Sequence, residues 1–368
     1  MRTVYVIAGE ASGDLHAANL VRALKASSPE MRFRGVGGDN MAAAGVEIFR
    51  HIRHTNFMGF AEVAANLHKI LRLFRDVKRD AKEFLPDYAL LIDYPGFNLR
   101  MAPFFRKLGA PVHYYIAPQL WAWKKGRVKI FKKHVERLYV ILPFEKAFFS
   151  GEGLETEYHG HPILDVAGVR DAAPMRETGP IALLPGSRPQ EIRKHLPVML
   201  AAAKPFAGEG RVVVAGAPAV APQFYAPLVK NYGFVDVWHG RTHELLNAAR
   251  AALTASGTAT LETALFNVPQ TVCYKAGAVS YFLAKRLVKV PHISLVNLIL
   301  GRRAVAERIQ YEVTPQVLAA ELESLLLDTE KRARLARDYA ELRTLLGGAG
   351  ASERVAHSML RQMNTKTF

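Results

Sequence analysis

Short apolar runs that alternate with segments of helical periodicity constrain the fold of this chain more than any other feature. Each run has the length of a β-strand, and most are followed by a helical pattern. The runs are TVYVIA (3–8), DYALLID (87–93), PVHYYIA (111–117), RLYVIL (137–142), PIALLP (180–185), RVVVAG (211–216), FVDVW (234–238), AALTA (251–255) and PQTVCY (269–274). Strands and helices that alternate in this way form parallel βα units. We therefore expect an α/β protein with doubly wound parallel sheets.

The runs fall into two series, which predicts two domains. A chain of 368 residues is too long for one ordinary core. The residues between the two series show no periodicity, as expected of a linker, and the stretch GGAGA interrupts the helical pattern near the end. We predict one α/β domain over 1–165, a linker over 166–178, a second α/β domain over 179–346, and a last helix over 347–368 that is free to cross back to the first domain.

The net charge of +16 indicates an anionic partner. A field of this size attracts nucleic acid, an anionic lipid surface or phosphorylated ligands. Nucleic acid is disfavoured, because the sequence has neither zinc-ligand cysteines nor an aromatic strand of the RNA-binding type. The single cysteine, Cys273, lies in an apolar run and is expected in the core. No apolar run is long enough to cross a membrane, and the N-terminus lacks the layout of a signal peptide, so we expect a cytoplasmic protein.

The loop LTASGTATLE follows a predicted strand and opens a predicted helix. In open parallel sheets, ligands bind outside the carboxyl ends of the strands, so such loops are the candidate sites. Ser256, Gly257 and Thr258 are small enough to let a phosphate reach the unpaired N–H groups and partial positive charge of a helix start. Glu262, one turn further on, could bond both hydroxyls of a ribose. Ordinary helix capping explains the same residues equally well.

The loop LLPGSRPQEI is a second strand-to-helix turn of this kind. Gly186 permits a tight turn, Ser187 can donate a hydrogen bond, and the guanidinium of Arg188 can clamp a phosphate. The alternative is an ordinary loop with a solvent-facing arginine. Two anion-suited turns in one domain support a nucleotide diphosphate as the ligand more strongly than either turn would alone.

The loops of the first domain offer a candidate base. The sequence DYPGFN places Asp93 at the carboxyl end of a strand, where a general base could take a proton from a hydroxyl group. The alternative is an Asx-turn or a cap before Pro95. Asn98 is a candidate partner for a sugar. The loop AGEASGD fits neither a dinucleotide-binding nor a Walker A motif, and Asp14 within it is equally suited to cap the following helix.

The stretch 57–79 has an apolar face with Lys and Arg beside it. This pattern is typical of a helix that lies in an anionic membrane interface, although it also fits a helix buried against its own sheet. We predict contact with the membrane. The face consists of Phe57, Met58, Phe60, Val63, Leu67, Ile70, Leu71 and Phe74.

Together these motifs resemble the lipid-A-disaccharide synthase family. AGEASGD, DYPGFN, APQLWAW, LPFEKAFF, GHPILD, LLPGSRPQEI, LTASGTATLE and AKRLVKVPHISLVNLI occur in the order of that family. The resemblance implies a GT-B fold, in which two Rossmann-like domains with doubly wound parallel sheets border an interdomain cleft. It implies an inverting, metal-independent glycosyl transfer without a cofactor. UDP-2,3-diacylglucosamine would react with 2,3-diacylglucosamine 1-phosphate to give the β-1',6-linked lipid A disaccharide 1-phosphate and UDP.

The resemblance also assigns residues. Asp93 matches the base for the acceptor 6-hydroxyl and, because Gly96 stands where some members carry Asp, it is the sole candidate acid of its loop. Val296 replaces the usual Pro in the SLVNL motif of Asn297. The donor site is expected to comprise Gly186, Ser187, Arg188, Ser256, Gly257, Thr258, Thr260, Glu262 and Asn297. The acceptor side is expected to comprise Ser12, Gly13, Asp14, Asn98 and Gln119.

The implied substrates extend the predictions to partners and location. The domain over 1–165 would bind the lipid acceptor, and the domain over 179–346 would bind the UDP-sugar. Both substrates carry acyl chains and phosphate, so the enzyme would work at an anionic membrane, on the cytoplasmic face of the inner membrane. No Asp-x-Asp pair is present to hold a metal ion, so Arg188 and helix N-termini would meet the leaving-group charge. A homodimer is left open.

Other functions stay as alternatives. The peptidoglycan N-acetylglucosaminyl transferase and the UDP-sugar 2-epimerase share the expected fold and a UDP-sugar. A nicotinamide-dependent oxidoreductase would need G-x-G-x-x-G after the first strand, which GEASGD does not supply. A non-catalytic membrane binder would leave Asp93 and both phosphate turns without a role.

Overall fold

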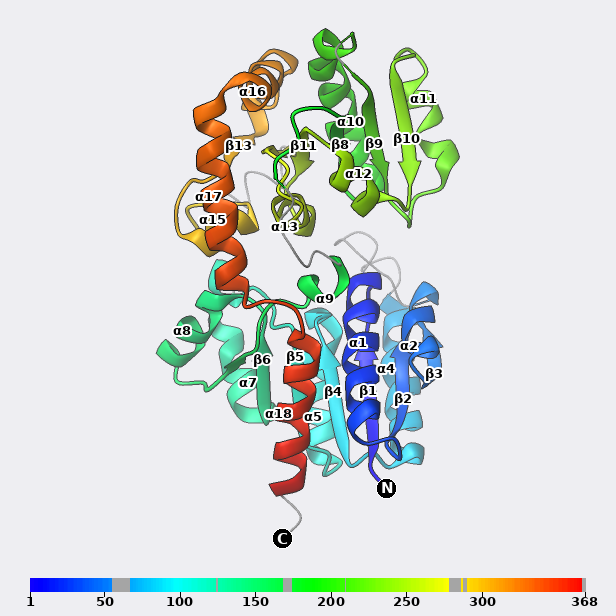
Figure 1. The fold of residues 1–368 in the computed structure, drawn as a ribbon. Coiled ribbons are helices and arrows are strands. Elements are labelled where there is room, and N and C mark those ends of the chain that lie inside the picture. Colours follow the sequence, from blue (N-terminus) through cyan, green and yellow to red (C-terminus); the bar gives the residue numbers. More distant parts are fainter. Residues whose placement is uncertain are drawn as a thin grey trace. The chain divides into compact units, whose positions relative to one another are not determined.

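The structure is a computed structural model that describes residues 1–54, 67–123, 125–167, 174–208, 210–277, 286 and 290–365. It divides into two compact units, one formed by Met1–Val166 with Gly347–Phe368 and the other by Ala167–Leu346. Each unit is an open parallel sheet covered by helices (Figure 1). The predicted α/β class with doubly wound parallel sheets is confirmed, and the end of the chain folds with the first unit.

The first unit has the strand order β3-β2-β1-β4-β5-β6-β7 over the residues described, and its paired strands are parallel. Its strands are β1 (Thr3–Ala8), β2 (Arg32–Gly37), β3 (Val46–His51), β4 (Tyr88–Ile92), β5 (Val112–Tyr115), β6 (Arg137–Val140) and β7 (Glu157–Tyr158). Its helices are α1 (Ala11–Ser27), α2 (Asp39–Ala43), α4 (Leu67–Phe84), α5 (Pro95–Lys107), α6 (Leu120–Trp123), α7 (Val128–His134), α8 (Pro143–Gly151), α9 (Ile163–Ala167, at the boundary) and α18 (Ala351–Thr365).

Strand β1 shows why its sequence reads as one continuous apolar run. Val4, Val6 and Ala8 belong to a core cluster with residues of α1 and α18, whereas Tyr5 and Ile7 belong to a cluster with residues of α4, α5 and α7. The two faces of a strand alternate with a period of two, so a strand covered on both faces needs apolar residues at every position. Figure 1 shows α1 and α18 on the same face of this sheet.

Helix α18 is attached to the first unit by a cap as well as by its apolar face. The carboxylate of Asp165 accepts hydrogen bonds from the backbone N–H groups of Gly350, Ala351 and Ser352, at 2.7, 3.1 and 2.8 Å, and from the Ser352 hydroxyl at 2.6 Å. These groups lie at the start of the helix, where backbone donors lack helical partners. The acid of the GHPILD motif therefore fixes the last helix of the chain.

The second unit has the strand order β10-β9-β8-β11-β12-β13 in its described part, again with parallel pairs. Its strands are β8 (Ile181–Leu184), β9 (Val212–Gly216), β10 (Val235–His239), β11 (Ala251–Ala255), β12 (Gln270–Tyr274) and β13 (Ala306–Ile309). Its helices are α10 (Pro189–Ala203), α11 (Ala226–Val229), α12 (Thr242–Ala248), α13 (Thr258–Leu265), α15 (Leu295–Leu300), α16 (Pro315–Leu327) and α17 (Thr329–Leu346).

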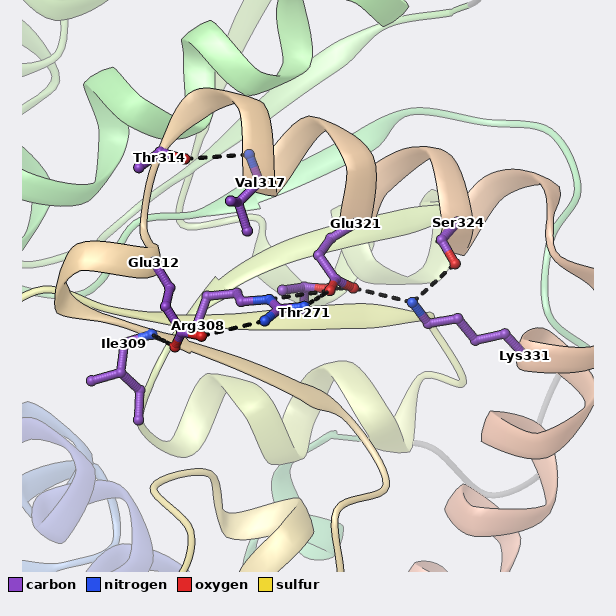
Figure 2. Close-up of polar contacts among 9 residues, drawn as sticks. All are labelled: Thr271, Arg308, Ile309, Glu312, Thr314, Val317, Glu321, Ser324 and Lys331. Carbon is purple, nitrogen blue, oxygen red and sulfur yellow. Dashed lines mark hydrogen bonds and ion pairs between the residues drawn. The ribbon is translucent and has the colours of Figure 1, made fainter.

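A polar network centred on Glu321 joins two strands to two helices in this unit (Figure 2). Arg308 of β13 donates from Nε to Oε1 of Glu321 on α16 at 3.1 Å, and Thr271 of β12 donates to Oε2 at 3.3 Å. Lys331 of α17 also donates to Oε2 at 3.1 Å. Glu321 is 9% exposed, so its charge is satisfied by protein donors and not mainly by water.

The structure adds strands that the apolar runs do not reveal. The predicted runs correspond to β1, β4, β5, β6, β8, β9, β10, β11 and β12, and the helices expected around 315–326 and 329–345 are α16 and α17. Strands β2, β3, β7 and β13 were not predicted, because charged residues interrupt their apolar pattern. Among the described residues, no helix is both long and apolar enough to span a bilayer.

Candidate active site

The turn after β4 holds Asp93 in a strained backbone conformation. Asp93 and Tyr94 have φ angles of 44° and 48°, in the left-handed region that residues other than glycine rarely adopt. The backbone N–H of Asp93 donates to the carbonyl of Tyr115 at 3.0 Å, and the Tyr114 hydroxyl donates to the carbonyl of Asp93 at 2.6 Å. Two consecutive strained residues persist only where surrounding bonds fix them, and such residues gather at functional sites.

The environment of Asp93 suits a general base. Burial, and to a smaller extent the negative charge of Glu10, raise the pKa of its carboxyl from the ordinary 3.8 to about 7. A backbone hydrogen bond from Tyr94 opposes these two effects. A base whose pKa lies near the working pH combines a useful ionised fraction with a strong affinity for protons.

Glu10 is a neighbour that the sequence did not reveal. Ala8 of β1 and Ile92 of β4 are paired in register, so Glu10 and Asp93 follow these two strands at the same edge of the sheet. Gly9 directly precedes Glu10, and a Cβ atom at Gly9 would lie 2.3 Å from the ring of Tyr94. The expectation of a single acid therefore holds within the DYPGFN loop but not for the site, because AGEASGD supplies a second carboxylate. Strand register is the signal that could have found it.

Asn98 and Asp14, both expected on the acceptor side, hold backbone segments in place in this structure. Asn98 is fully buried, and its amide donates to the carbonyls of Ile7, Ile92 and Asp93 at 3.3, 3.2 and 2.8 Å. It fastens the strained turn to the ends of β1 and β4. Asp14 is 2% exposed and does not cap its own helix.

The carboxylate of Asp14 instead caps α2. It accepts hydrogen bonds from the backbone N–H groups of Gly38, Asn40 and Met41 at 2.6, 3.0 and 3.2 Å. The remaining residues proposed for the acceptor side differ in exposure: Ser12 and Gln119 are exposed, whereas Gly13 is buried. A Cβ atom at Gly13 would lie 3.6 Å from Cβ of Ala8, so this position packs on the end of β1.

In the second unit, the LPGSR turn presents an exposed guanidinium. Gly186 has a φ of 114°, and a Cβ atom there would lie 2.7 Å from a carboxylate oxygen of Glu191. That carboxylate accepts from the Ser187 N–H at 3.2 Å and pairs with Arg188 at 3.0 Å. The Arg188 side chain is 54% exposed, and an exposed ion pair of this kind is weak enough to be exchanged for a phosphate.

The SGTAT turn leads into α13 without a side-chain cap. Gly257 is the N-cap residue with a φ of 152°, and the position where its Cβ would lie has no atom within 4 Å. Gly257 and Thr258 are exposed, whereas Thr260 is buried and donates from its hydroxyl to the Gly257 carbonyl at 2.8 Å. Over the residues described, no side chain satisfies the first N–H groups of α13. An anion is the expected partner for such a helix start.

Glu262, one turn into α13, is paired with a histidine. The Nε2 atom of His243 on α12 lies 3.1 Å from Oε1 of Glu262. Both side chains reach solvent, at 36% and 23% exposure respectively. The carboxylate is therefore accessible to a ligand and also has a protein partner, which the sequence did not reveal.

Asn297, which the SLVNL motif led us to expect near the nucleotide, belongs to a buried hydrogen-bond network. It is fully buried, its amide donates to Glu307 at 2.9 Å, and its carbonyl accepts from the N–H groups of Ala304 and Val305 at 2.8 and 2.9 Å. The same Glu307 accepts from the N–H of Ile293 at 3.2 Å.

This network braces the SGTAT turn. The carbonyl of Ile293 accepts a hydrogen bond from the Ser256 hydroxyl at 2.9 Å, so the chain from Asn297 through Glu307 and Ile293 ends at the SGTAT turn. Asn297 therefore acts on the turn by fixing the loop beside it. Val296, which precedes Asn297 in the sequence, is also fully buried and takes part in packing.

The predicted membrane face falls partly on described residues. Phe57, Met58, Phe60 and Val63 lie outside them, as does the side chain of Leu67. Leu71 is 55% exposed and Ile70 is half-buried. Phe74 packs on the core, where its ring stacks on Phe97 with centroids 4.2 Å apart. Among the described residues, no cluster of three or more His, Cys, Asp or Glu is arranged to hold a metal ion.

Comparison with known proteins identifies relatives of this chain. The family model described as lipid-A-disaccharide synthetase matches residues 4–362. The lipid-A-disaccharide synthase of Myxococcus xanthus is 39% identical, over 97% of this chain and 96% of the relative.

Solved structures with low sequence identity share the fold. The UDP-GlcNAc 2-epimerase from Neisseria meningitidis bound to UDP-GlcNAc has a TM-score of 0.67 at 11% identity, over 98% of this chain and all of that one. The calicheamicin glycosyltransferase CalG4 has a TM-score of 0.63 at 18% identity, over the whole of both chains. The fold is therefore GT-B. The match of the family model over nearly the whole sequence, together with the 39% identical relative, shows that this chain belongs to the lipid-A-disaccharide synthase family.

Proposed function

We propose that this protein transfers the 2,3-diacylglucosaminyl group of UDP-2,3-diacylglucosamine to the 6-hydroxyl of 2,3-diacylglucosamine 1-phosphate. The products are the β-1',6-linked disaccharide 1-phosphate and UDP. Within a chain of this family, the observation that carries the proposal is the strained turn after β4, which holds Asp93 with a pKa of about 7. A base is needed because a sugar hydroxyl is a weak nucleophile until its proton is removed.

In the proposed mechanism, Asp93 accepts the proton of the 6-hydroxyl as that oxygen attacks C1 of the donor sugar. The attack comes from the face opposite UDP, so the anomeric configuration inverts. The bond between C1 and the diphosphate oxygen breaks, and its electron pair leaves with UDP. Glu10 does not take the proton in this scheme. Its negative charge makes the carboxylate of Asp93 more basic.

The second unit would bind the donor through two turns. The uncapped N–H groups at the start of α13 would receive the diphosphate, and Arg188 would exchange its exposed partner Glu191 for a phosphate oxygen. Glu262 would accept hydrogen bonds from the ribose hydroxyls. The structure of the Neisseria epimerase, which has a similar fold and is bound to UDP-GlcNAc, supports a UDP-sugar as the ligand.

We further propose that α4 lies at the anionic cytoplasmic face of the inner membrane, where the acylated substrates are found. Its inner face packs Leu73, Val77 and Ala81 into the core of the first unit. Its outer face exposes Leu71 together with basic residues, which are Lys69, Arg72, Arg75, Arg79 and Lys82. Such a surface is attracted to anionic headgroups by about 1 kcal/mol for each basic residue close to them.

The reaction can be tested by measuring UDP release from the diacylated donor with and without the monosaccharide phosphate. We expect release that depends on the acceptor, with a disaccharide phosphate as the second product. The Asp93→Asn variant should bind UDP normally while turnover falls by at least about a hundredfold. Release of UDP without acceptor, formation of a 2-epimer, or full turnover by Asp93→Asn would contradict the proposal.

A further inference from the structure

His243 has no role in the mechanism above, yet its hydrogen bond to Glu262 links two helices at the proposed donor site. We propose that His243 is a positioning residue, which holds the Glu262 carboxylate in the orientation that receives the 2'- and 3'-hydroxyls of the UDP ribose. This inference rests on the proposed function, since it takes the SGTAT turn as the UDP site. The distance of 3.1 Å between Nε2 and Oε1 is that of a hydrogen bond.

The placement of His243 is suited to this task. It is the second residue of α12, the helix that connects β10 to β11. Strand β11 leads directly into the SGTAT turn. Its ring lies against Phe266, with centroids 5.3 Å apart and an interplanar angle of 33°. Phe266 in turn packs against the apolar cluster formed by β8, β9, β11 and α12. The imidazole is therefore supported by the core on one side and meets the carboxylate on the other.

The chemistry of the pair leaves room for a ribose. An ionised carboxylate only accepts hydrogen bonds, so Nε2 of His243 must be the donor, and this holds for the neutral tautomer with a proton on Nε2 and for the imidazolium. A carboxylate has about four lone-pair sites on its two oxygens, so a single bond from His243 leaves acceptor capacity for two hydroxyls. An unsupported Glu would have to be ordered when the ligand binds, whereas a supported one is already in place.

The exposures of the two side chains separate this role from simple helix packing. Glu262 is 23% exposed and His243 is 36% exposed, so the pair lies at the surface where a ligand can reach it. An exposed pair contributes little to folding. If its purpose were stability alone, its loss would matter little to the protein and would not depend on which nucleotide is offered.

The test compares UDP with 2',3'-dideoxy-UDP, which lacks the hydroxyls, by titration calorimetry on the full-length protein. We expect the wild type to prefer UDP and His243→Ala to lose most of that preference, by weakening UDP binding about three- to tenfold while dideoxy-UDP binding is unchanged. His243→Gln, which keeps a donor near the same position, should restore the preference. Glu244→Gln, in the next position of α12 and paired with Arg241, is the matched control and should behave as wild type.

Turnover gives an independent readout. His243→Ala should raise the KM for the donor and leave the KM for the acceptor and kcat unchanged, because a ribose contact acts on binding and not on the reacting bond. If His243→Ala weakened the binding of UDP and of dideoxy-UDP equally, the role of His243 would be overturned. The same holds if His243→Ala kept the preference for UDP while Glu262→Ala abolished it. Both outcomes would leave the ribose site intact. A Glu262→Ala variant that still prefers UDP would overturn the ribose assignment itself, and this inference with it.

Discussion

Glu10 and Asp93 follow the carboxyl ends of the neighbouring strands β1 and β4, and the charge of Glu10 adds to burial in raising the pKa of Asp93 to about 7. This relationship predicts the pH dependence of the reaction. A base works only when ionised, so kcat/KM should rise with pH and level off above an inflection near pH 7. Measurement of initial rates between pH 5 and pH 9 checks this expectation.

The Glu10→Gln variant should shift that inflection to lower pH. The inflection should stay above the ordinary value of 3.8, because burial is the larger cause of the raised pKa and is unchanged. An inflection that does not move in Glu10→Gln would show that Glu10 has no influence on the base.

A raised pKa also means that ionised Asp93 costs folding free energy at high pH. Asp93→Asn should therefore increase the melting temperature more at pH 8 than at pH 4.

Gly9 controls the geometry of the same turn. A methyl group there would lie 2.3 Å from the ring of Tyr94, which follows Asp93 directly, so Gly9→Ala must displace the ring and the turn with it. We expect kcat to fall by about a hundredfold, since small displacements of a catalytic group are costly. Gly96→Ala is the matched control, because the added Cβ has no atom within 4 Å. Equal activity of the two variants would show that the turn tolerates movement of Tyr94.

The proposed contact of α4 with the membrane can be tested by reversing the charges on its outer face. Replacing Lys69, Arg72 and Arg75 by Glu should reduce binding to vesicles that contain anionic lipid by more than about a hundredfold at low salt. Replacing the exposed Arg334 and Arg337 of α17 by Glu serves as the control, because each such replacement changes the net charge by −2, as on α4, but at another place on the protein. Sedimentation with vesicles measures both. If the two sets of changes reduce binding equally, net charge accounts for the attraction and α4 has no special role.

The fold could be predicted from the sequence because most strands are covered on both faces. A strand of this kind, such as β1 or β9, must be apolar at every position, and it stands out in the sequence. Strand β2 was missed because Arg34 faces the helix layer, where the buried carboxylate of Asp80 accepts from its Nε and from the Tyr5 hydroxyl. The partner that makes the charge acceptable lies 46 residues away in sequence, so no local pattern reveals it.

The site residues were harder to predict than the fold, for a related reason. Motif position indicated Asn98 and Asn297, but a motif does not distinguish a residue that touches the ligand from one that holds the loop. The structure shows that both hold backbone segments, since both are fully buried and bonded to backbone groups. His243 and Glu10 belong to the opposite case. Each meets its acidic neighbour only through the arrangement of strands and helices.

Asp14 provides a test of that distinction. Its carboxylate accepts from three N–H groups at the start of α2, so Asp14→Ala should lower the free energy of unfolding by about 1–2 kcal/mol. The KM for the acceptor should not change in the folded variant. Asp39→Ala is the control, because Asp39 begins the same helix but is exposed and pairs only with surface residues in the described part of the chain. A raised acceptor KM with unchanged stability would return Asp14 to the acceptor site.

The Glu321 network predicts how the stability of the second unit depends on pH. Burial alone would raise the pKa of Glu321, but hydrogen bonds from Arg308 and Lys331 outweigh it, so the pKa in the folded state lies below the ordinary 4.5. The charged form therefore stabilises the fold above about pH 4.5, and this contribution disappears as the pH falls through the lower pKa of the folded state. Glu321→Gln should lower the free energy of unfolding by about 2–3 kcal/mol at pH 7 and by progressively less in acid.

Glu312→Gln is the control. It removes the 53% exposed partner of Arg308 and should lower the free energy of unfolding by less than about 0.5 kcal/mol. Urea titrations at pH 7 and pH 4 measure both variants, and a cost for Glu321→Gln that is the same at the two pH values would mean that packing, and not its charge, holds α16 to the sheet.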